Sequence, residues 1–257
     1  MKVIIITQDE PFYIPVLMGK VLAEYKGIIG VITLPTIPKG FTMLSSVKRL
    51  YDVFGLRDFL AYGALFAYHK VADLLSHWKR PSRPYSVRSA CRTNSIPVYR
   101  LRKVNEPESI KLIKTLAPEV VVSVASPQIF EKEMLNLPKY ALNIHAALLP
   151  HYKGIMPSFW VLAKGEEKTG ITVHYMSEYI DKGNIILQRT ISISPQDTLH
   201  SLQNKVADVG AMALLEALEK IEKTDVTGTP PNGSGSYYSF PTKEAAREFR
   251  ARGRRFI

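Results

Sequence analysis

The sequence predicts an α/β protein built on a doubly wound, mostly parallel β-sheet. Three apolar runs support this prediction, because none of them alternates with polar residues: VIII at 3–6, IIGVITL at 28–34 and VVVSV at 120–124. Segments with helical patterns separate them, at 13–25 and 107–117. Strands that are apolar on both faces and alternate with helices are typical of a parallel sheet covered on both sides. Such sheets bind ligands in the crevice outside the carboxyl ends of their strands.

The second half of the chain predicts two more strands, a short helix and a long helix. The segment PSFWVLAKG (157–165) opens on proline and closes on glycine, as helices often do. GITVHYM (170–176) and NIILQRTISI (184–193) are predicted strands with a polar connection between them. From Asp197, apolar residues recur every three or four positions. This spacing predicts an amphipathic helix over 197–221 with Asp197 as its N-cap.

We expect one main domain over 1–225 with a helical, basic insertion at about 36–95, then a linker and basic helical tail over 226–257. The aromatic-rich segment 51–78 is interrupted by charges, so it is not expected to span a membrane. Either it packs against the sheet as an insertion, or it is a surface helix for a membrane or a partner. The segment 80–89, with two prolines and three arginines, is expected to be an exposed loop.

Positive charge is concentrated in two segments of a chain whose net charge is +11. Residues 79–103 hold eight basic and no acidic residues, and the tail from 243 to 257 holds six basic residues against two acidic ones. Such segments either attract nucleic acid, anionic lipid or a phosphorylated substrate, or act as solvated faces. The single cysteine, Cys91, excludes an intrachain disulfide, and the first apolar run is too short for a secretion signal. We therefore expect a cytoplasmic protein.

Three polar side chains are predicted to meet at one edge of the sheet. Asn143 and His145 stand two apart at the end of an apolar run, so they face the same way on a strand. Asp181 follows the strand at 170–176. An amide, an imidazole and a carboxylate fit acyl transfer without a protein nucleophile: Asn143 and a protonated His145 would stabilise an oxyanion, and Asp181 would hold His145 or a relay water. Taken singly, each residue could equally be structural. A metal site is not expected, because HxH and HxxxH ligand pairs are missing.

The segment from Leu142 to Gln188 resembles the core signature of the folate-dependent formyltransferases. That family includes methionyl-tRNA formyltransferases, amino-sugar N-formyltransferases and glycinamide ribonucleotide transformylases. The shared features occur here in the family's order: Asn-x-His, Leu-Leu-Pro, a Gly and a Pro before a helix, Gly-Ile-Thr-Val-His and Asp-x-Gly. Weaker similarity extends over most of the chain except about 36–95 and the tail.

The resemblance implies a Rossmann-like domain that takes a formyl group from 10-formyltetrahydrofolate. It places the family's catalytic residues on Asn143, His145 and Asp181. The folate-pocket residues that it implies lie in two loops and are Ser126, Pro127, Gln128, Ile129, Phe130, Glu178, Tyr179 and Ile180. Where many relatives have glycine before the catalytic Asp, the chain has bulky residues at 178–180, which would narrow or reorder the folate loop. His174 is expected either to be structural or to support the catalytic residues from behind.

The resemblance leaves the amine acceptor open. Asp9 and Glu10, in the turn after the first strand, would repel a phosphate there, which disfavours glycinamide ribonucleotide. We expect an anionic small-molecule amine, with a phosphorylated or nucleotide-linked amino sugar as the leading candidate. The alternatives are initiator tRNA, although no C-terminal barrel is expected after Asp181, a hydrolase that releases formate, and a folate- or partner-binding module without turnover. The oligomeric state is not predicted.

Overall fold

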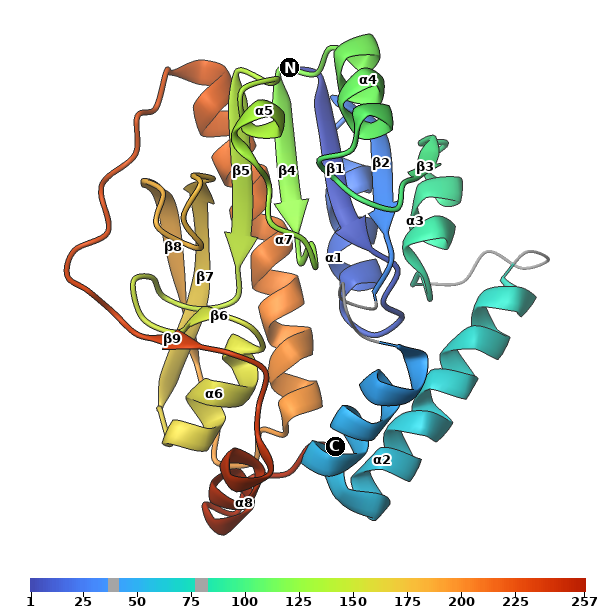
Figure 1. The fold of residues 1–257 in the computed structure, drawn as a ribbon, viewed down its shortest axis with the longest axis vertical. Helices are drawn as coiled ribbons and strands as arrows, with labels where there is room; N and C mark the ends of the chain where they lie inside the picture. The colour runs from blue at the N-terminus through green and yellow to red at the C-terminus, as the bar shows by residue number, and fades with distance from the viewer. Residues whose placement is uncertain (37–41, 77–82) are drawn as a thin grey trace.

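The computed structural model describes residues 1–36, 42–76 and 83–257. A sheet of seven strands runs through the molecule in the order β3-β2-β1-β4-β5-β7-β8 (Figure 1). These strands are β1 (Val3–Gln8), β2 (Ile28–Leu34), β3 (Val98–Arg100), β4 (Val120–Val124), β5 (Tyr140–His145), β7 (Lys168–Tyr175) and β8 (Ile185–Ser192). The first five pair in parallel, and β7 and β8 join as antiparallel strands. The predicted α/β, mostly parallel architecture is confirmed.

Helices cover both faces of the sheet (Figure 1). The helices of the described residues are α1 (Ile14–Glu24), α2 (Met43–Leu75), α3 (Val87–Thr93), α4 (Pro107–Leu116), α5 (Lys132–Leu135), α6 (Pro157–Lys164), α7 (Leu199–Lys223) and α8 (Lys243–Ala251), of which α2 and α8 lie beyond the end of the sheet. On one face, Ile4 and Ile6 of β1 pack with the apolar side of α4. On the other, Val3 and Ile5 pack with α1 and α7. Alternate residues of one strand therefore fill two separate cores, which is why its sequence is apolar without alternation.

The strand order reverses at β1, which lies between β2 and β4. In doubly wound sheets, ligands bind near such a reversal, outside the carboxyl ends of the strands. β5 ends at this edge with Asn143 and His145. A two-stranded sheet, β6 (Lys153–Gly154) paired with β9 (Tyr237–Tyr238), lies beyond the end of β5. The fold therefore brings the segments that contain β5, β6 and β9 together near this strand end.

The helix predicted from Asp197 is present, but its N-cap is Thr198. The Thr198 hydroxyl accepts a hydrogen bond from the N–H of Ser201, and the Ser201 hydroxyl accepts one from the N–H of Thr198. Asp197 lies one residue earlier, where its carboxylate accepts from the Ser194 N–H at 2.7 Å and from the Lys205 ammonium at 2.7 Å. A reciprocal capping box thus prevails over the single acidic cap expected from the sequence.

The segment between β2 and β3 differs from its prediction in two ways. The helix expected over 51–78 begins at Met43 and is divided at Gly55, which has a φ of +69°. The segment 80–89 is not a loop throughout, because Ser86 caps α3 and Val87 is fully buried. Residues 77–78 and 80–82 lie outside the described residues. The prediction of an exposed loop is therefore wrong from residue 87 onward, where a capping box follows the prolines.

The C-terminal tail forms the expected helix, α8, and its aromatic residues are part of the core. Phe249 and Phe256 are fully buried, and Phe249 stacks on Phe159 of α6 with ring centroids 5.1 Å apart. Its basic residues are used internally: Lys243 pairs with Asp52 of α2 at 2.9 Å. Arg250 pairs with another α2 carboxylate at 3.3 Å and donates to backbone carbonyls there. The tail therefore offers a polyanion fewer free cations than its composition suggests.

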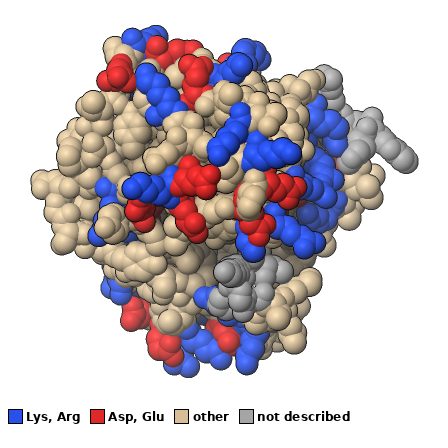
Figure 2. Space-filling model, turned by 45° about the horizontal axis from the view of Figure 1, so that its top comes forward, with Lys and Arg blue, Asp and Glu red and all other residues tan. Residues whose placement is uncertain are grey.

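On the face drawn in Figure 2, Lys and Arg side chains gather where Figure 1 has α3 and β3, and elsewhere they mix with Asp and Glu. The concentration of charge predicted over 79–103 is thus visible in its described part. Among the described residues, no helix is long and apolar enough to cross a membrane.

The buried tail gives a direct test of the packing. Replacing Phe249 with Ala should lower the free energy of unfolding by about 3–5 kcal/mol, because a fully buried ring is lost and leaves a cavity. Urea unfolding followed by circular dichroism measures this change. Tyr237→Ala is the control, since the Tyr237 side chain is exposed. Equal, small effects of the two substitutions would show that the tail does not belong to the core.

Candidate functional site

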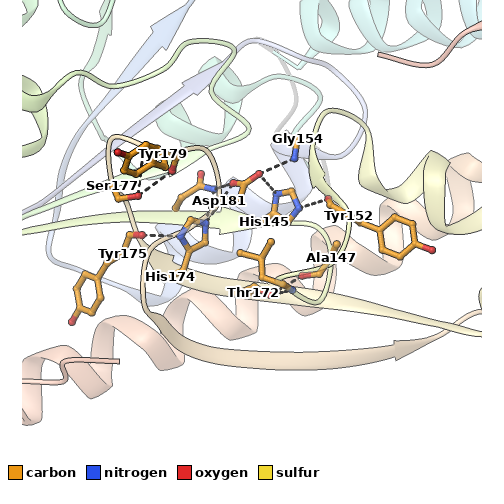
Figure 3. A network of polar contacts seen from close by, with 12 residues as sticks. His145, Ala147, Tyr152, Gly154, Thr172, His174, Tyr175, Ser177, Tyr179 and Asp181 are labelled. Carbon is orange, nitrogen blue, oxygen red and sulfur yellow. Dashed lines mark hydrogen bonds and ion pairs between the residues drawn. The ribbon is translucent and has the colours of Figure 1, made fainter. Parts of the chain in front are cut away.

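The candidate site is centred on the Asp181 carboxylate, in the loop between β7 and β8 (Figure 3). The backbone of Asp181 lies in the left-handed region, with a φ of +51°. Gly183 keeps the loop tight, because a Cβ there would lie 1.7 Å from the Tyr175 carbonyl oxygen. Oδ2 of Asp181 accepts a 2.8 Å hydrogen bond from the Gly154 N–H. The side chain is 9% exposed, so this loop turns a carboxylate into the protein beside the end of β5.

His145, the last residue of β5, faces Asp181 with one nitrogen of its ring. Nδ1 lies 3.6 Å from Oδ2 of Asp181. Nε2 lies 2.8 Å from the Tyr152 carbonyl oxygen. A carbonyl oxygen only accepts, so Nε2 carries the hydrogen of the neutral ring. In that tautomer Nδ1 is an unprotonated nitrogen directed at the carboxylate, and a proton arriving there would lie between the two groups.

Asn143 and His174, partners across β5 and β7, complete the network. Nδ1 of His174 donates to the Tyr175 carbonyl at 2.8 Å, which leaves Nε2 as an acceptor. Nδ2 of Asn143 lies 3.1 Å from that Nε2 and 3.4 Å from Oδ1 of Asp181. Both amide hydrogens therefore have acceptors, and the bond to Asp181 is the longer and weaker one. The structure thus brings the three predicted residues together and places His174 behind them, in one of the two positions expected for it from the sequence.

The network favours an ionised Asp181 beside a neutral His145. Burial alone would raise the pKa of Asp181, but the protonated forms of His145 and His174, together with the Gly154 N–H, lower this pKa to about 2. Burial lowers the pKa of His145 below its usual value, by more than the Asp181 carboxylate raises it. At neutral pH the pair therefore holds one negative charge and one vacant position for a proton.

The turn after β5 is fixed by hydrogen bonds from the two antiparallel strands. Thr172 of β7 donates to the Ala147 carbonyl at 2.7 Å and accepts from the Leu149 N–H at 3.1 Å. Gln188 of β8 donates to the Leu149 carbonyl and to the Thr172 hydroxyl, each at 2.9 Å. The peptide bond after Leu149 is cis. These bonds set the path that returns the Tyr152 carbonyl to His145.

Residues 234–238, within and just after the predicted linker, form a strap along the loop that carries the Tyr152 carbonyl. The Ser236 hydroxyl accepts from the Tyr152 N–H at 2.9 Å, and the Ser236 carbonyl accepts from the Lys153 N–H at 2.9 Å. Tyr238 stacks on Tyr152 with ring centroids 5.4 Å apart. The strap holds the residue that fixes the His145 tautomer. Its sequence, Ser-Gly-Ser-Tyr-Tyr, gives no signal of this role.

The predicted folate-pocket residues after β4 are of two kinds. The Gln128 side chain bonds to the backbone of the loop before α4, and Phe130 is buried in the core with α4. Both side chains support the loop from within. Ile129 is 60% exposed, and Ser126 and Pro127 are half-buried. The loop therefore presents the Ile129 side chain and backbone groups to solvent.

The second predicted part of the folate pocket, residues 178–180, also faces outward. Tyr179 is 69% exposed and Ile180 is 41% exposed, and Glu178 is exposed as well. The Ser177 hydroxyl accepts from the Tyr179 N–H at 3.3 Å and donates to its carbonyl at 3.0 Å, which closes a local turn (Figure 3). The bulky side chains therefore lie on the surface of the loop. In the described parts of the chain, no group of His, Cys, Asp and Glu is arranged to hold a metal ion.

The pKa of His145 has a measurable consequence for stability. Because its pKa is lowered on folding, the unfolded chain binds the proton first, and native stability falls as pH drops below about 6.5. His145→Gln should therefore show a shallower loss of unfolding free energy between about pH 7 and pH 5. The exposed His151, replaced by Gln, is the control and should keep the wild-type slope. If the unfolding free energy of the wild type and of both variants fell with pH at the same slope, a neutral, buried His145 would be contradicted.

A family model described as "Formyl transferase" matches residues 66–218, more than half of the chain. Among curated relatives, a methionyl-tRNA formyltransferase from Pelotomaculum thermopropionicum is 35% identical over 62% of this chain and 51% of that protein. The chain thus spans about half the length of the curated relatives that it matches.

Solved structures with the same fold include two sugar N-formyltransferase-type proteins. One, a sugar N-formyltransferase from a Shewanella species, has a TM-score of 0.59 and 19% identity, covering 93% of this chain and 76% of that one. The other, an N-formyltransferase from Helicobacter canadensis in complex with folinic acid and dTDP-3-aminofucose, has a TM-score of 0.58 and 20% identity, covering 93% and 71%. At this identity the likeness establishes the fold.

Proposed function

The chain belongs to the formyl transferase family, and from this premise we propose that it transfers a formyl group from 10-formyltetrahydrofolate to a primary amine. The observation that carries the proposal is the network of Asn143, His145 and Asp181 at the end of β5. An acyl transfer needs a donor for the oxyanion, an acceptor for the amine's proton and a rigid geometry. The network supplies all three, and Asn143, His145 and Asp181 are its catalytic residues.

Attack of the amine nitrogen on the formyl carbon forms a C–N bond and turns the formyl oxygen into an oxyanion. Asn143 is the donor for this oxygen. Its amide must first release one hydrogen, and the 3.4 Å bond to Asp181 is weaker than the 3.1 Å bond to His174. The Asn143 amide therefore releases the hydrogen that is bonded to Asp181 and turns it toward the negative charge that develops on the formyl oxygen in the transition state.

The proton released by the attacking amine goes to the His145–Asp181 pair. Nδ1 of neutral His145 is the vacant position, and the imidazolium that forms is stabilised by the carboxylate 3.6 Å away. When the intermediate collapses, the bond between the formyl carbon and N10 of the folate breaks. The same proton then passes to N10, giving a formamide and tetrahydrofolate. His174 positions Asn143 and Asp181 without touching the substrate.

The folate lies along the loops after β4 and before Asp181 in this proposal. Ser126, Pro127 and Ile129 line one side with backbone and apolar groups, while Gln128 and Phe130 hold that loop in place. Glu178, Tyr179 and Ile180 form the opposite side. Lys182 Nζ lies over the Tyr179 ring, 5.3 Å from its centroid, and because the Tyr179 side chain is 69% exposed we expect its other face to stack on an aromatic ring.

For the acceptor, a nucleotide-linked amino sugar remains our leading candidate. At the N-terminus of α1 the Glu10 carboxylate already accepts from the N–H groups of Phe12, Tyr13 and Ile14, which leaves few donors for a phosphate. Burial is the largest effect on Glu10 and raises its pKa to about 7 despite these bonds. A phosphate held at this helix end, as glycinamide ribonucleotide would require, is therefore disfavoured.

Transfer to initiator tRNA is the second candidate. It is favoured by the 35% identity to a methionyl-tRNA formyltransferase and by the basic residues of the stretch after Pro84. Four arginines stand between 87 and 103 together with one lysine, and no acid lies among them. A polyanion bound there would release counterions, which gives the two acceptors different responses to salt.

Removing a member of the network should abolish most of the activity. We expect Asn143→Ala, His145→Ala and Asp181→Asn each to lower kcat/KM for formyl transfer by about 10²–10⁴-fold. The double variant of His145 and Asp181 should lose little more than the worse single variant, since the two act as a unit. Exposed His151, replaced by Ala, is the control. Full activity of the His145 variant would exclude this mechanism.

The acceptor is tested by offering dTDP- and UDP-linked amino sugars and initiator methionyl-tRNA to the same enzyme at two salt concentrations. An amino-sugar acceptor should be formylated at a rate that changes little between about 50 and 200 mM salt, because it makes few phosphate contacts. Formylation of tRNA that falls by about 10²-fold or more over this range would instead favour the second candidate. Turnover of neither would count against both.

A further inference from the structure

The outward face of α2 is a large, solvent-exposed apolar surface. The face is formed by two legs that meet at Gly55, and Figure 1 shows them as a V at the edge of the molecule. Its most exposed apolar side chains share exposures of 57–80%: Met43, Leu44, Leu56, Leu60, Val71, Leu74 and Leu75. Leucine side chains exposed to this degree on one element cost free energy in water, so a partner is expected.

The second leg, residues 56–75, separates its two faces cleanly. Leu56, Leu60, Ala67, Val71 and Leu74 recur at steps of three, four or seven and therefore share one side of the helix. A Cβ added to Gly63, on the same side, would meet no atom within 4 Å.

The opposite side of this leg is fastened to the body of the protein. Tyr62 and His69 pack against Phe12, with ring centroids 5.6 and 5.5 Å apart. His69 is 2% exposed. The orientation of the leg is therefore fixed, and its leucines point away from the sheet domain.

Charges on α2 are sorted by side. Its three carboxylates face the protein: Asp52 pairs with Lys243, Asp58 pairs with Arg250, and Asp73 accepts from the Ser86 hydroxyl at 2.7 Å. No acidic side chain of α2 is exposed.

The exposed charges of α2 are all positive, at Lys48, Arg57 and Lys70. By helical geometry, Arg57 and Lys70 lie on opposite sides of the leucine stripe. Each is displaced from it around the helix axis by about the rotation of one residue. An apolar stripe bordered by cations matches a surface that is apolar inside and negatively charged at its rim. Anionic lipid bilayers have that arrangement.

A second copy of the chain fits this face less well. A contact between the second legs of two copies would have only the cations Arg57 and Lys70 of each copy at its border, because no acidic side chain of α2 is exposed. Like charges at the border of an apolar contact oppose its formation. A bilayer with anionic headgroups meets the same cations with opposite charge.

We propose that the outward face of α2 binds the surface of an anionic membrane. The leucines of both legs enter the boundary between headgroups and acyl chains, while Lys48, Arg57 and Lys70 contact lipid phosphates. The protein is held at the interface and does not span it. This inference is independent of the acceptor, and it uses residues outside the site around Asp181.

Flotation with lipid vesicles tests the proposal. The full chain should float with vesicles made of equal phosphatidylcholine and phosphatidylglycerol, and much less with phosphatidylcholine alone. Replacing both Leu60 and Leu74 with Gln should lower binding at least tenfold. Replacing Arg57 and Lys70 with Gln should lower binding to the anionic vesicles by about 30-fold, since each cation contributes about a factor of five near a charged surface.

Matched control variants distinguish lipid binding through α2 from nonspecific binding of the protein to vesicles. Met212→Gln removes an equally exposed apolar side chain from α7, and Lys168→Gln with Lys223→Gln removes two exposed cations elsewhere. Both should bind like wild type. Circular dichroism and thermal unfolding show that each variant is folded.

Three results would overturn the proposal. The first is absence of binding to anionic vesicles, and the second is equal binding by the α2 variants and the controls. The third is a stable dimer in analytical ultracentrifugation that becomes monomeric when Leu60 and Leu74 are replaced, because α2 would then be covered by a second copy of the chain.

Discussion

The buried charge of Asp181 is the constraint on which the rest of the site depends. A carboxylate removed from water is costly unless hydrogen-bond donors and opposite charge compensate it. Here the compensation comes from the Gly154 N–H and the Asn143 amide, and His145 and His174 add opposite charge whenever they are protonated; these groups belong to three different segments of the chain. Each of these groups needs its own support. The loop after β5 is therefore tied to β7, β8 and the strap at 234–238.

The same network explains how one site could serve both halves of the formyl transfer that we propose. Asn143 holds one strong and one weaker hydrogen bond, so it can turn toward an oxyanion without leaving His174. His145 has its Nε2 hydrogen fixed by a carbonyl and its Nδ1 vacant beside a carboxylate. The site is thus prepared for negative charge on one side and for a proton on the other, before any substrate arrives.

Local patterns in the sequence were enough to predict the sheet, and the family resemblance was needed to single out the three central residues. Asn143 and His145 share a face because strands alternate, and the family spacing places Asp181. Other features depend on pairing between distant segments, which local patterns do not encode. The strap at 234–238 reads as a flexible linker, yet its Ser236 holds the loop at Tyr152. Similarly, the prolines before α3 suggested a loop where Ser86 and Ser89 form a capping box. The N-cap of α7 is Thr198 and not the neighbouring Asp197.

The protonation state of His145 links the geometry to the proposed chemistry most closely. Nitrogen-15 NMR of histidine-labelled protein, with the His145 signals assigned from the His145→Gln variant, reports which ring nitrogen is protonated. At pH 7 we expect a neutral ring with its hydrogen on Nε2 and an unprotonated Nδ1. A doubly protonated ring, or a hydrogen on Nδ1, would contradict both the role of the Tyr152 carbonyl and the transfer of the amine's proton to His145.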